Sequence, residues 1–174
     1  MGIYQGLRQK QFRLYLYTNQ LPEKVAMAFN PLKLDQFPAY LKSLTPTDWK
    51  PLIDLIHEIE ETKVFSEVPE IEEFEPGIPI LPMYNIVADV VIKFQQEALN
   101  LNIIIDFHWS AWDEGVKLAY GPPDRIDQID LLTACKLITV FVRTDRFSDG
   151  VLANSFESGL MLRVLKRIRQ LTQK

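Results

Sequence analysis

The sequence predicts an α+β protein that is mainly helical, a compact bundle of about five helices with an N-terminal β-hairpin. Three observations lead to this fold class. Apolar residues recur at steps of three and four over residues 83–101, 129–146 and 160–171, which is the period of a helix with one buried face. Residues 9–30 instead alternate with a period of two, as a half-buried hairpin does. Prolines crowd residues 63–82 and exclude a long helix there.

The composition supports one sizeable core. The chain has 174 residues, of which 47% are hydrophobic, and a folded protein of this size buries about 70% of the surface that its extended chain exposes. We divide the chain into an N-terminal β-hairpin extension, residues 1–45, and a helical domain, residues 46–174. One cysteine and two histidines exclude a disulfide framework, a four-cysteine zinc site and a histidine-rich metal centre. We therefore expect no metal and no cofactor.

The helical domain is predicted to begin with a helix over residues 48–62, which Thr47 or Asp48 is expected to cap. Pro51 is tolerated in this helix because it lies in the first turn. The proline-rich residues 63–82 that follow are predicted to form an extended, acidic connector.

The middle of the chain is predicted to hold two helices and a buried segment between them. The helix over residues 83–101 has the clearest periodicity. The β-branched residues 103–105 are expected to form a short strand that pairs with the hairpin. Ser110 is then expected to cap a helix that runs to Tyr120.

The helix over residues 129–146 is predicted to be the central one, because it buries a wide apolar stripe and leaves only a narrow polar strip in solvent. This strip is formed by Thr133, Lys136, Thr139 and Arg143. A short helix that ends near Phe156 and a last helix over residues 160–171 follow, and Gly159 separates them.

Charge is unevenly distributed, although the net charge is only −4. Most charged residues at 58–75 are acidic, whereas all charged residues after Glu157 are basic. We interpret these stretches as solvated faces of opposite sign, with pairing between molecules as the weaker alternative. The charge balance disfavours nucleic acid as a partner. No apolar run reaches the roughly 18 residues that a membrane span needs, and the N-terminus lacks an apolar signal core, so we expect a cytoplasmic protein with no membrane contact.

The densest polar cluster is the corner at residues 143–150. Asp145 continues the apolar stripe of the long helix, so its carboxylate needs hydrogen-bond donors. We favour a structural role, a buried salt-bridge corner in which Arg143, Arg146 or the amides that open the next helix supply those donors. The functional alternative is an anion or substrate site built from the guanidinium groups and a helix N-terminus.

A second cluster lies at residues 106–114. Asp106 and His108 could act together as a general base, and Trp112 could line a pocket. No nucleophile stands near them in the sequence, and tryptophans more often anchor a helix to a core. We therefore favour a structural role for this cluster as well.

The most distinctive stretch is residues 143–159, with the pattern R-x-D-R-F-x-x-G-x-L-A-x-x-F-E-S-G. Together with Asp106, Trp109 and Trp112, it resembles a family of bacterial proteins that is catalogued only as a domain of unknown function. The resemblance covers about residues 49–171. It implies a compact, mostly helical cytosolic domain and brings no activity, cofactor or catalytic residue.

Two classes of function remain after these observations. We favour a non-enzymatic soluble binding or protein-interaction module, whose partner is another protein or a second copy of the chain in a homodimer formed through the hairpin edge. The alternative is a small-ligand (anion) binding protein or an enzyme, with a pocket around the Trp109–Trp112 helix and the Arg143–Gly150 corner. Its candidate ligand-binding residues are Asp106, His108, Trp112, Arg143, Asp145 and Arg146. The sequence leaves open whether the protein is an enzyme, and the lack of a nucleophile–base pairing favours a non-enzyme.

Overall fold

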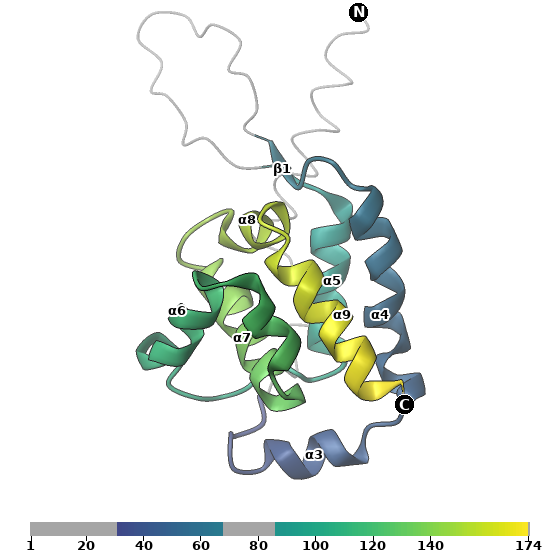
Figure 1. Ribbon diagram of the computed structural model, residues 1–174, viewed down its shortest axis with the longest axis vertical. Helices are drawn as coiled ribbons and strands as arrows, with labels where there is room; N and C mark the ends of the chain where they lie inside the picture. Colours follow the sequence, from purple (N-terminus) through teal and green to yellow (C-terminus); the bar gives the residue numbers. More distant parts are fainter. Residues whose placement is uncertain (1–30, 68–85, 174) are drawn as a thin grey trace, which may run out of the picture. The chain divides into compact units, whose positions relative to one another are not determined.

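The computed structural model describes residues 31–67 and 86–173. These residues are mainly helical: helices α3 to α9, two short 3-10 helices and a small two-stranded antiparallel sheet (Figure 1). The predicted mainly α class is therefore confirmed, with more helices than the expected five. The predicted hairpin at residues 9–30 and most of the predicted connector at residues 63–82 lie outside the described residues.

Helices α3 (Phe37–Ser43) and α4 (Pro46–Glu61) open the described part of the chain. Thr45, not Thr47 or Asp48, is the residue that caps α4. The Asp48 carboxylate accepts hydrogen bonds from the backbone N–H and the hydroxyl of Thr45, both at 2.6 Å. These two bonds lower the pKa of Asp48. The expected cap was wrong because Asp48 is the third residue of the helix. Its carboxylate bonds back to the cap residue Thr45, as in a capping box.

The helix expected from residue 83 begins later, because α5 covers Asp89–Asn100. Residues 86–87 form strand β2 (Ile86–Val87), which pairs antiparallel with β1 (Ser66–Glu67). The backbone N–H of Ala88 donates to the Phe65 carbonyl at 2.9 Å and closes this small sheet. The apolar residues at 86 and 87 continue the helical period of the sequence, so periodicity alone misplaces the boundary.

Residues 103–105 are fully buried but do not form the expected strand. The backbone N–H of Ile105 donates to the Thr139 hydroxyl at 3.0 Å, and that of Asp106 donates to the Leu32 carbonyl at 2.9 Å. A single parallel bridge joins Lys33 to Asp106. The segment is therefore held by isolated hydrogen bonds and by burial.

A single helix from Ser110 to Tyr120 was expected, and this expectation is wrong. A 3-10 helix, η1 (Trp109–Ala111), comes first, and α6 (Asp113–Ala119) follows after a break at Trp112. The φ and ψ angles of Trp112, −91° and 85°, are outside the helical region. Trp109 and Trp112 consequently do not share one α-helical face. A second 3-10 helix, η2 (Pro123–Gln128), leads into the C-terminal helices.

Helix α7 (Leu131–Thr144) contacts α3, α6, α8, α9 and η1, so the prediction that it is the central helix is confirmed. The placement of Thr139 in a solvated strip was wrong. Its side chain is fully buried, and its hydroxyl donates to the Cys135 carbonyl at 2.9 Å while it accepts from Ile105. Because this hydroxyl both donates and accepts a hydrogen bond, burying the threonine leaves no polar group unpaired.

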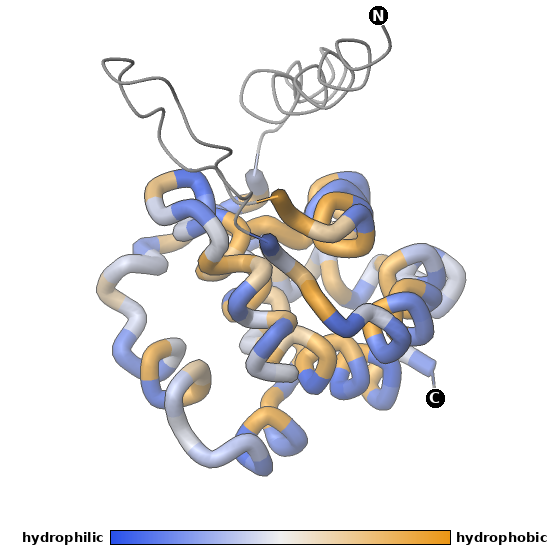
Figure 2. Tube along the Cα trace, turned by 90° about the horizontal axis from the view of Figure 1, so that it is seen from above, coloured by the Kyte–Doolittle hydropathy of each residue, from blue (hydrophilic) through white to orange (hydrophobic). Residues whose placement is uncertain are grey.

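Glycines mark both ends of the short helix α8 (Val151–Glu157). Gly150 precedes it with φ 85°, and Gly159 precedes α9 (Leu160–Thr172) with φ 74°. Both angles lie in the left-handed region, where only glycine carries no steric cost. Figure 2 shows apolar and polar residues alternating along the helices of the described part of the chain, as expected for helices that bury one face.

The acidic and basic stretches meet within one molecule. Glu58 pairs with Lys93 of α5 at 2.7 Å, and Glu60 pairs with Lys166 of α9 at 2.6 Å. The guanidinium Nε of Arg167 donates to the Ile129 carbonyl at 2.8 Å. Glu58, Glu60 and Lys166 thus find their charge partners within the same molecule. None of the helices in the described ranges is long and apolar enough to cross a membrane.

Candidate functional site

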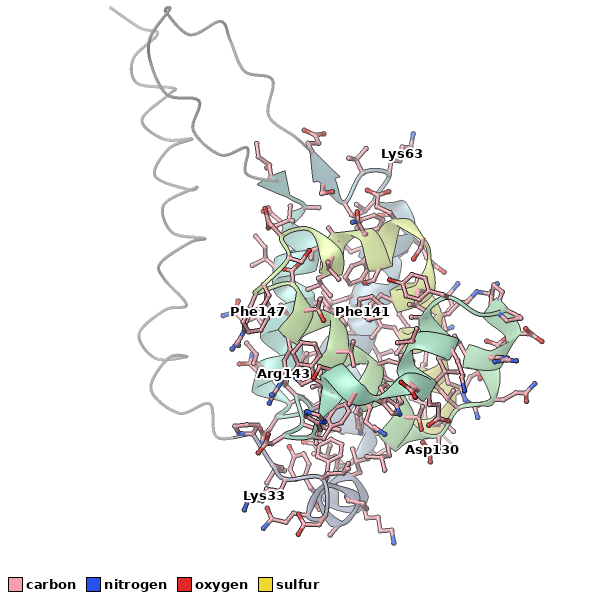
Figure 3. The ribbon with its side chains drawn as sticks, turned by 90° about the vertical axis from the view of Figure 1, so that its left-hand side faces the viewer. Lys33, Lys63, Asp130, Phe141, Arg143 and Phe147 are labelled. Atoms are coloured by element: carbon pink, nitrogen blue, oxygen red, sulfur yellow. The ribbon has the colours of Figure 1, made fainter. Side chains whose placement is uncertain are left out.

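Aromatic and basic side chains from two distant segments meet on one surface. We call this surface the aromatic–basic face. It consists of Phe107, Trp109, Trp112, Lys136, Arg143, Arg146 and Phe147. The first three come from the segment that leads into α6, and the others from α7 and the turn after it. Figure 3 shows the labelled Arg143 and Phe147 on the same side of the described unit.

Trp112 is fixed by contacts on three sides. Its ring packs edge-on against Phe107, with 5.8 Å between the ring centroids, and Lys136 Nζ lies 4.1 Å from its ring centroid. A cation at this distance over an indole is a cation–π contact. Gly115 lies against the ring, and a Cβ atom at residue 115 would come within 2.3 Å of Trp112 Cε3. Trp112 thus joins α6 to α7 and is only partly exposed.

The exposed Phe147 stacks on Trp109, which is partly buried. Their ring centroids are 6.4 Å apart, and their planes are inclined by only 22°. Phe147 is 81% exposed, so most of its ring faces solvent. Burying a phenylalanine is normally favourable by about 1.5–3 kcal/mol. This pair is therefore the most evident apolar contact site on the face.

Two arginines lie just before Phe147 in the sequence. Arg143 is half-buried in the last turn of α7, and Arg146 is exposed one turn further on. The pKa of Arg143 is lowered, mainly by burial. The negative charge of Asp106 opposes this shift, and the positive charge of Arg146 adds to it. Within residues 31–67 and 86–173, neither arginine takes part in an ion pair.

Asp145 has a different environment from its two basic neighbours. Its Oδ1 accepts a hydrogen bond from the backbone N–H of Leu152 at 2.9 Å, and the amides of Gly150 and Val151 also bond to the carboxylate. Burial nevertheless raises the pKa of Asp145, because desolvation outweighs these bonds. The carboxylate occupies the N-terminus of α8. The N-terminus of α8, which the sequence offered as a site for an external anion, is therefore occupied by a side chain of the protein itself.

Asp106 and His108 are both exposed. The Asp106 backbone donates to Leu32, and its carboxylate lies close enough to Arg143 to raise the pKa of that arginine. Among the described residues no hydrogen bond joins the side chains of Asp106 and His108. Their arrangement therefore lacks the oriented carboxylate–imidazole contact that a general base of this type uses.

The remaining residues of the 143–159 pattern hold the fold together. Phe156 is 2% exposed and lies between Phe65 and Phe94, with centroid distances of 5.4 and 5.1 Å. The Glu157 carboxylate accepts a hydrogen bond from the Phe65 backbone N–H at 2.7 Å. These contacts attach α8 to α5 and to the segment before β1.

Sequence reasoning placed Trp112, Arg143 and Arg146 among the candidates, and these three belong to the face. The candidate Asp106 lies near enough to Arg143 for its charge to act on that arginine. Sequence reasoning missed Lys136 and Phe147. Both lie at helical steps from Arg143, at residues 136, 140, 143 and 147, so a helical projection continued past residue 144 could have found them.

A surface hollow lies elsewhere in the described structure. Its volume is about 200 Å³, and it lies between the start of α4 and the end of α5. The lining residues are Asp48, Pro51, Leu52, Glu97, Asn100 and Leu101. None of them belongs to the aromatic–basic face. In the described ranges no group of three or more histidine, cysteine or acidic side chains could hold a metal ion.

Comparison with known proteins assigns a family without an activity. Searches of curated proteins and of solved structures gave no match. Residues 44–174 match a family described as "Family of unknown function (DUF6508)". This region includes α4 to α9, the aromatic–basic face and the whole 143–159 pattern. The chain therefore belongs to the DUF6508 family.

Proposed function

We propose that this protein is a non-enzymatic protein-interaction module that binds its partner through the aromatic–basic face. The observation that carries the proposal is the exposed stack of Phe147 on Trp109 beside Arg143 and Arg146. Aromatic residues and arginine are enriched at the centres of protein interfaces and supply most of their binding energy. A large exposed aromatic next to guanidinium groups that form no ion pair within residues 31–67 and 86–173 fits this composition.

The geometry supports an interaction module better than the small-anion or enzyme alternative. Asp145 already occupies the amides at the start of α8, and Asp106 and His108 are not joined by a hydrogen bond. The surface hollow between α4 and α5 includes none of the residues of the face. We also propose a cytoplasmic location, which the single buried cysteine, Cys135, supports.

Site-specific photo-crosslinking tests the proposal. A photoreactive phenylalanine analogue replaces Phe147 in one variant and His57 in another, and both variants are produced in cells that natively contain the protein. His57 is exposed on α4, which packs on α5 and α9 and lies apart from the face. We expect a discrete crosslinked protein from residue 147 and none from residue 57.

A second comparison separates the alternatives. Arg143→Ser together with Arg146→Ser should abolish the crosslink from residue 147, because the partner loses its charged contacts. Identical patterns from residues 147 and 57, or no crosslinked protein at all, would refute the interaction module. A small-anion protein would give the second of these results.

A further inference from the structure

We propose that the partner presents an acidic peptide segment, in which an aromatic side chain lies two residues from a carboxylate, to the aromatic–basic face. This inference rests on the proposed function and names the chemistry of the ligand. Arg143 and Arg146 would bind the carboxylates, and the exposed ring of Phe147 would stack against the aromatic side chain.

The charges at the end of α7 favour an anionic ligand. Arg143 and Arg146 are three residues apart, so they lie on neighbouring positions of the helix end and repel each other. Each guanidinium presents a planar fork of donors that matches a carboxylate. A ligand carboxylate placed between them would relieve this repulsion and form charge-assisted hydrogen bonds.

The nearby acids favour a short acidic peptide over a nucleic acid. Asp106 lies beside Arg143, and Asp145 and Asp149 follow within a few residues. A phosphate backbone, which carries a charge at every nucleotide, would meet these carboxylates as well as the arginines. A peptide can place one or two carboxylates at the guanidinium groups and neutral residues elsewhere.

The spacing on the face sets the spacing in the ligand. Arg143 lies in the last turn of α7, and Phe147 lies in the turn that continues it, where the amides of Phe147 and Ser148 both donate to the Thr144 carbonyl. The two residues are therefore about one helical turn apart, and such a turn rises about 5.4 Å. In an extended peptide, residues i and i+2 lie on the same side and about 6.5–7 Å apart. An acid and an aromatic residue separated by one residue can therefore reach both side chains at once.

Fluorescence anisotropy with a defined peptide tests this inference. The probe is a fluorescein-labelled synthetic peptide of sequence Gly-Ser-Glu-Ser-Phe-Ser-Glu-Ser-Gly. The protein is the full chain with Phe74→Ser, because residues 72–74 carry the same acid-x-aromatic pattern and would otherwise compete with the probe. We expect saturable binding that weakens about tenfold with Arg143→Gln plus Arg146→Gln, and by a similar factor with Phe147→Ala.

Matched controls make the result decisive. Arg163→Gln plus Lys166→Gln removes two basic groups from α9 and should leave binding unchanged. Replacing the probe's glutamates by glutamine, or its phenylalanine by alanine, should each abolish most of the binding. Thermal unfolding of every variant shows whether a loss of binding reflects a loss of folding.

Three results would overturn the inference. The first is no binding of the peptide at millimolar protein. The second is binding that the arginine and Phe147 variants leave unchanged. The third is tighter binding of a twelve-residue oligodeoxythymidine, or equal competition by inorganic phosphate. Crosslinking from residue 147 to a protein without such a segment would refute the peptide chemistry and leave the proposed function intact.

Discussion

Phe147 and Phe156 are nine residues apart in the same pattern, yet their environments are opposite. Phe156 is 2% exposed between two other phenylalanines, whereas Phe147 is 81% exposed and stacks on Trp109. The same contrast separates Asp145, which accepts from backbone amides, from Arg146, which points to solvent. Some residues of the pattern are held in the fold by packing and hydrogen bonds, and others are exposed.

This contrast shows that a shared sequence pattern does not imply a shared role. The residues from Gly150 to Gly159 are accounted for by backbone conformation, burial and hydrogen bonds. Arg146 and Phe147, in contrast, are exposed in the described structure. Measured stabilities should therefore divide the pattern into two groups.

The largest effect is expected for Phe156→Ala. Truncation of this ring leaves a cavity between Phe65 and Phe94, and such changes cost about 3–5 kcal/mol of the free energy of unfolding. Urea denaturation followed by circular dichroism measures the loss. Phe156→Leu, which fills most of the space, should cost clearly less. An Ala variant as stable as the wild type would show that α8 is not anchored as the structure indicates.

Asp145→Ala should give an intermediate effect. The substitution leaves the amides that open α8 without their acceptor, and the loss of a helix cap costs about 1–2 kcal/mol. Asp145→Asn keeps an acceptor oxygen and should cost less. Denaturation at neutral pH measures both values. Equal losses in the two variants would show that the charge, not the hydrogen bonds, matters at this position.

The pH dependence of stability gives an independent check on Asp145. Burial raises the pKa of this carboxyl above the usual 3.8, so the folded protein takes up the proton at a higher pH than the unfolded chain. Protonation therefore adds to the free energy of unfolding as the pH falls through the folded pKa toward 3.8. We subtract the free energy of unfolding of Asp145→Asn from that of the wild type. This difference should rise as the pH is lowered from about 7 to about 4. A fall in this difference would mean that the pKa is lowered on folding.

Local patterns in the sequence predicted most of the fold. The glycine at 159 and the apolar stripe of α7 each reflect contacts within a few residues, and the structure confirms them. The misplaced features depend on distant partners. Thr139 is buried because Ile105 donates to it, and Ile86 belongs to a strand because residue 67 pairs with it. No helical period contains that information.

The candidate site shows the same limit. The arginines stood out as a cluster in the sequence, but their meeting with Trp109 and Trp112 depends on how the segment before α6 crosses α7. The break at Trp112, which directs that ring onto Lys136, requires Gly115 beneath it. A sequence pattern typical of one continuous helix hides this break, because Ser110 and Asp113 are both good residues for a helix start.

The smallest effect on stability is expected for Phe147→Ala, and it is the sharpest test of the comparison. A side chain that is 81% exposed loses little on truncation, so the free energy of unfolding should change by no more than about 0.5 kcal/mol. Denaturation of the Phe147→Ala and Phe156→Ala variants side by side measures both roles in one experiment. A loss above 1 kcal/mol, which would be well outside the range of about 0.5 kcal/mol for surface changes, would show that Phe147 anchors Trp109 for folding. A variant that is as stable as the wild type but fails to bind would instead show that the Phe147 ring stabilises the complex with a partner, because the folded chain would then not depend on it.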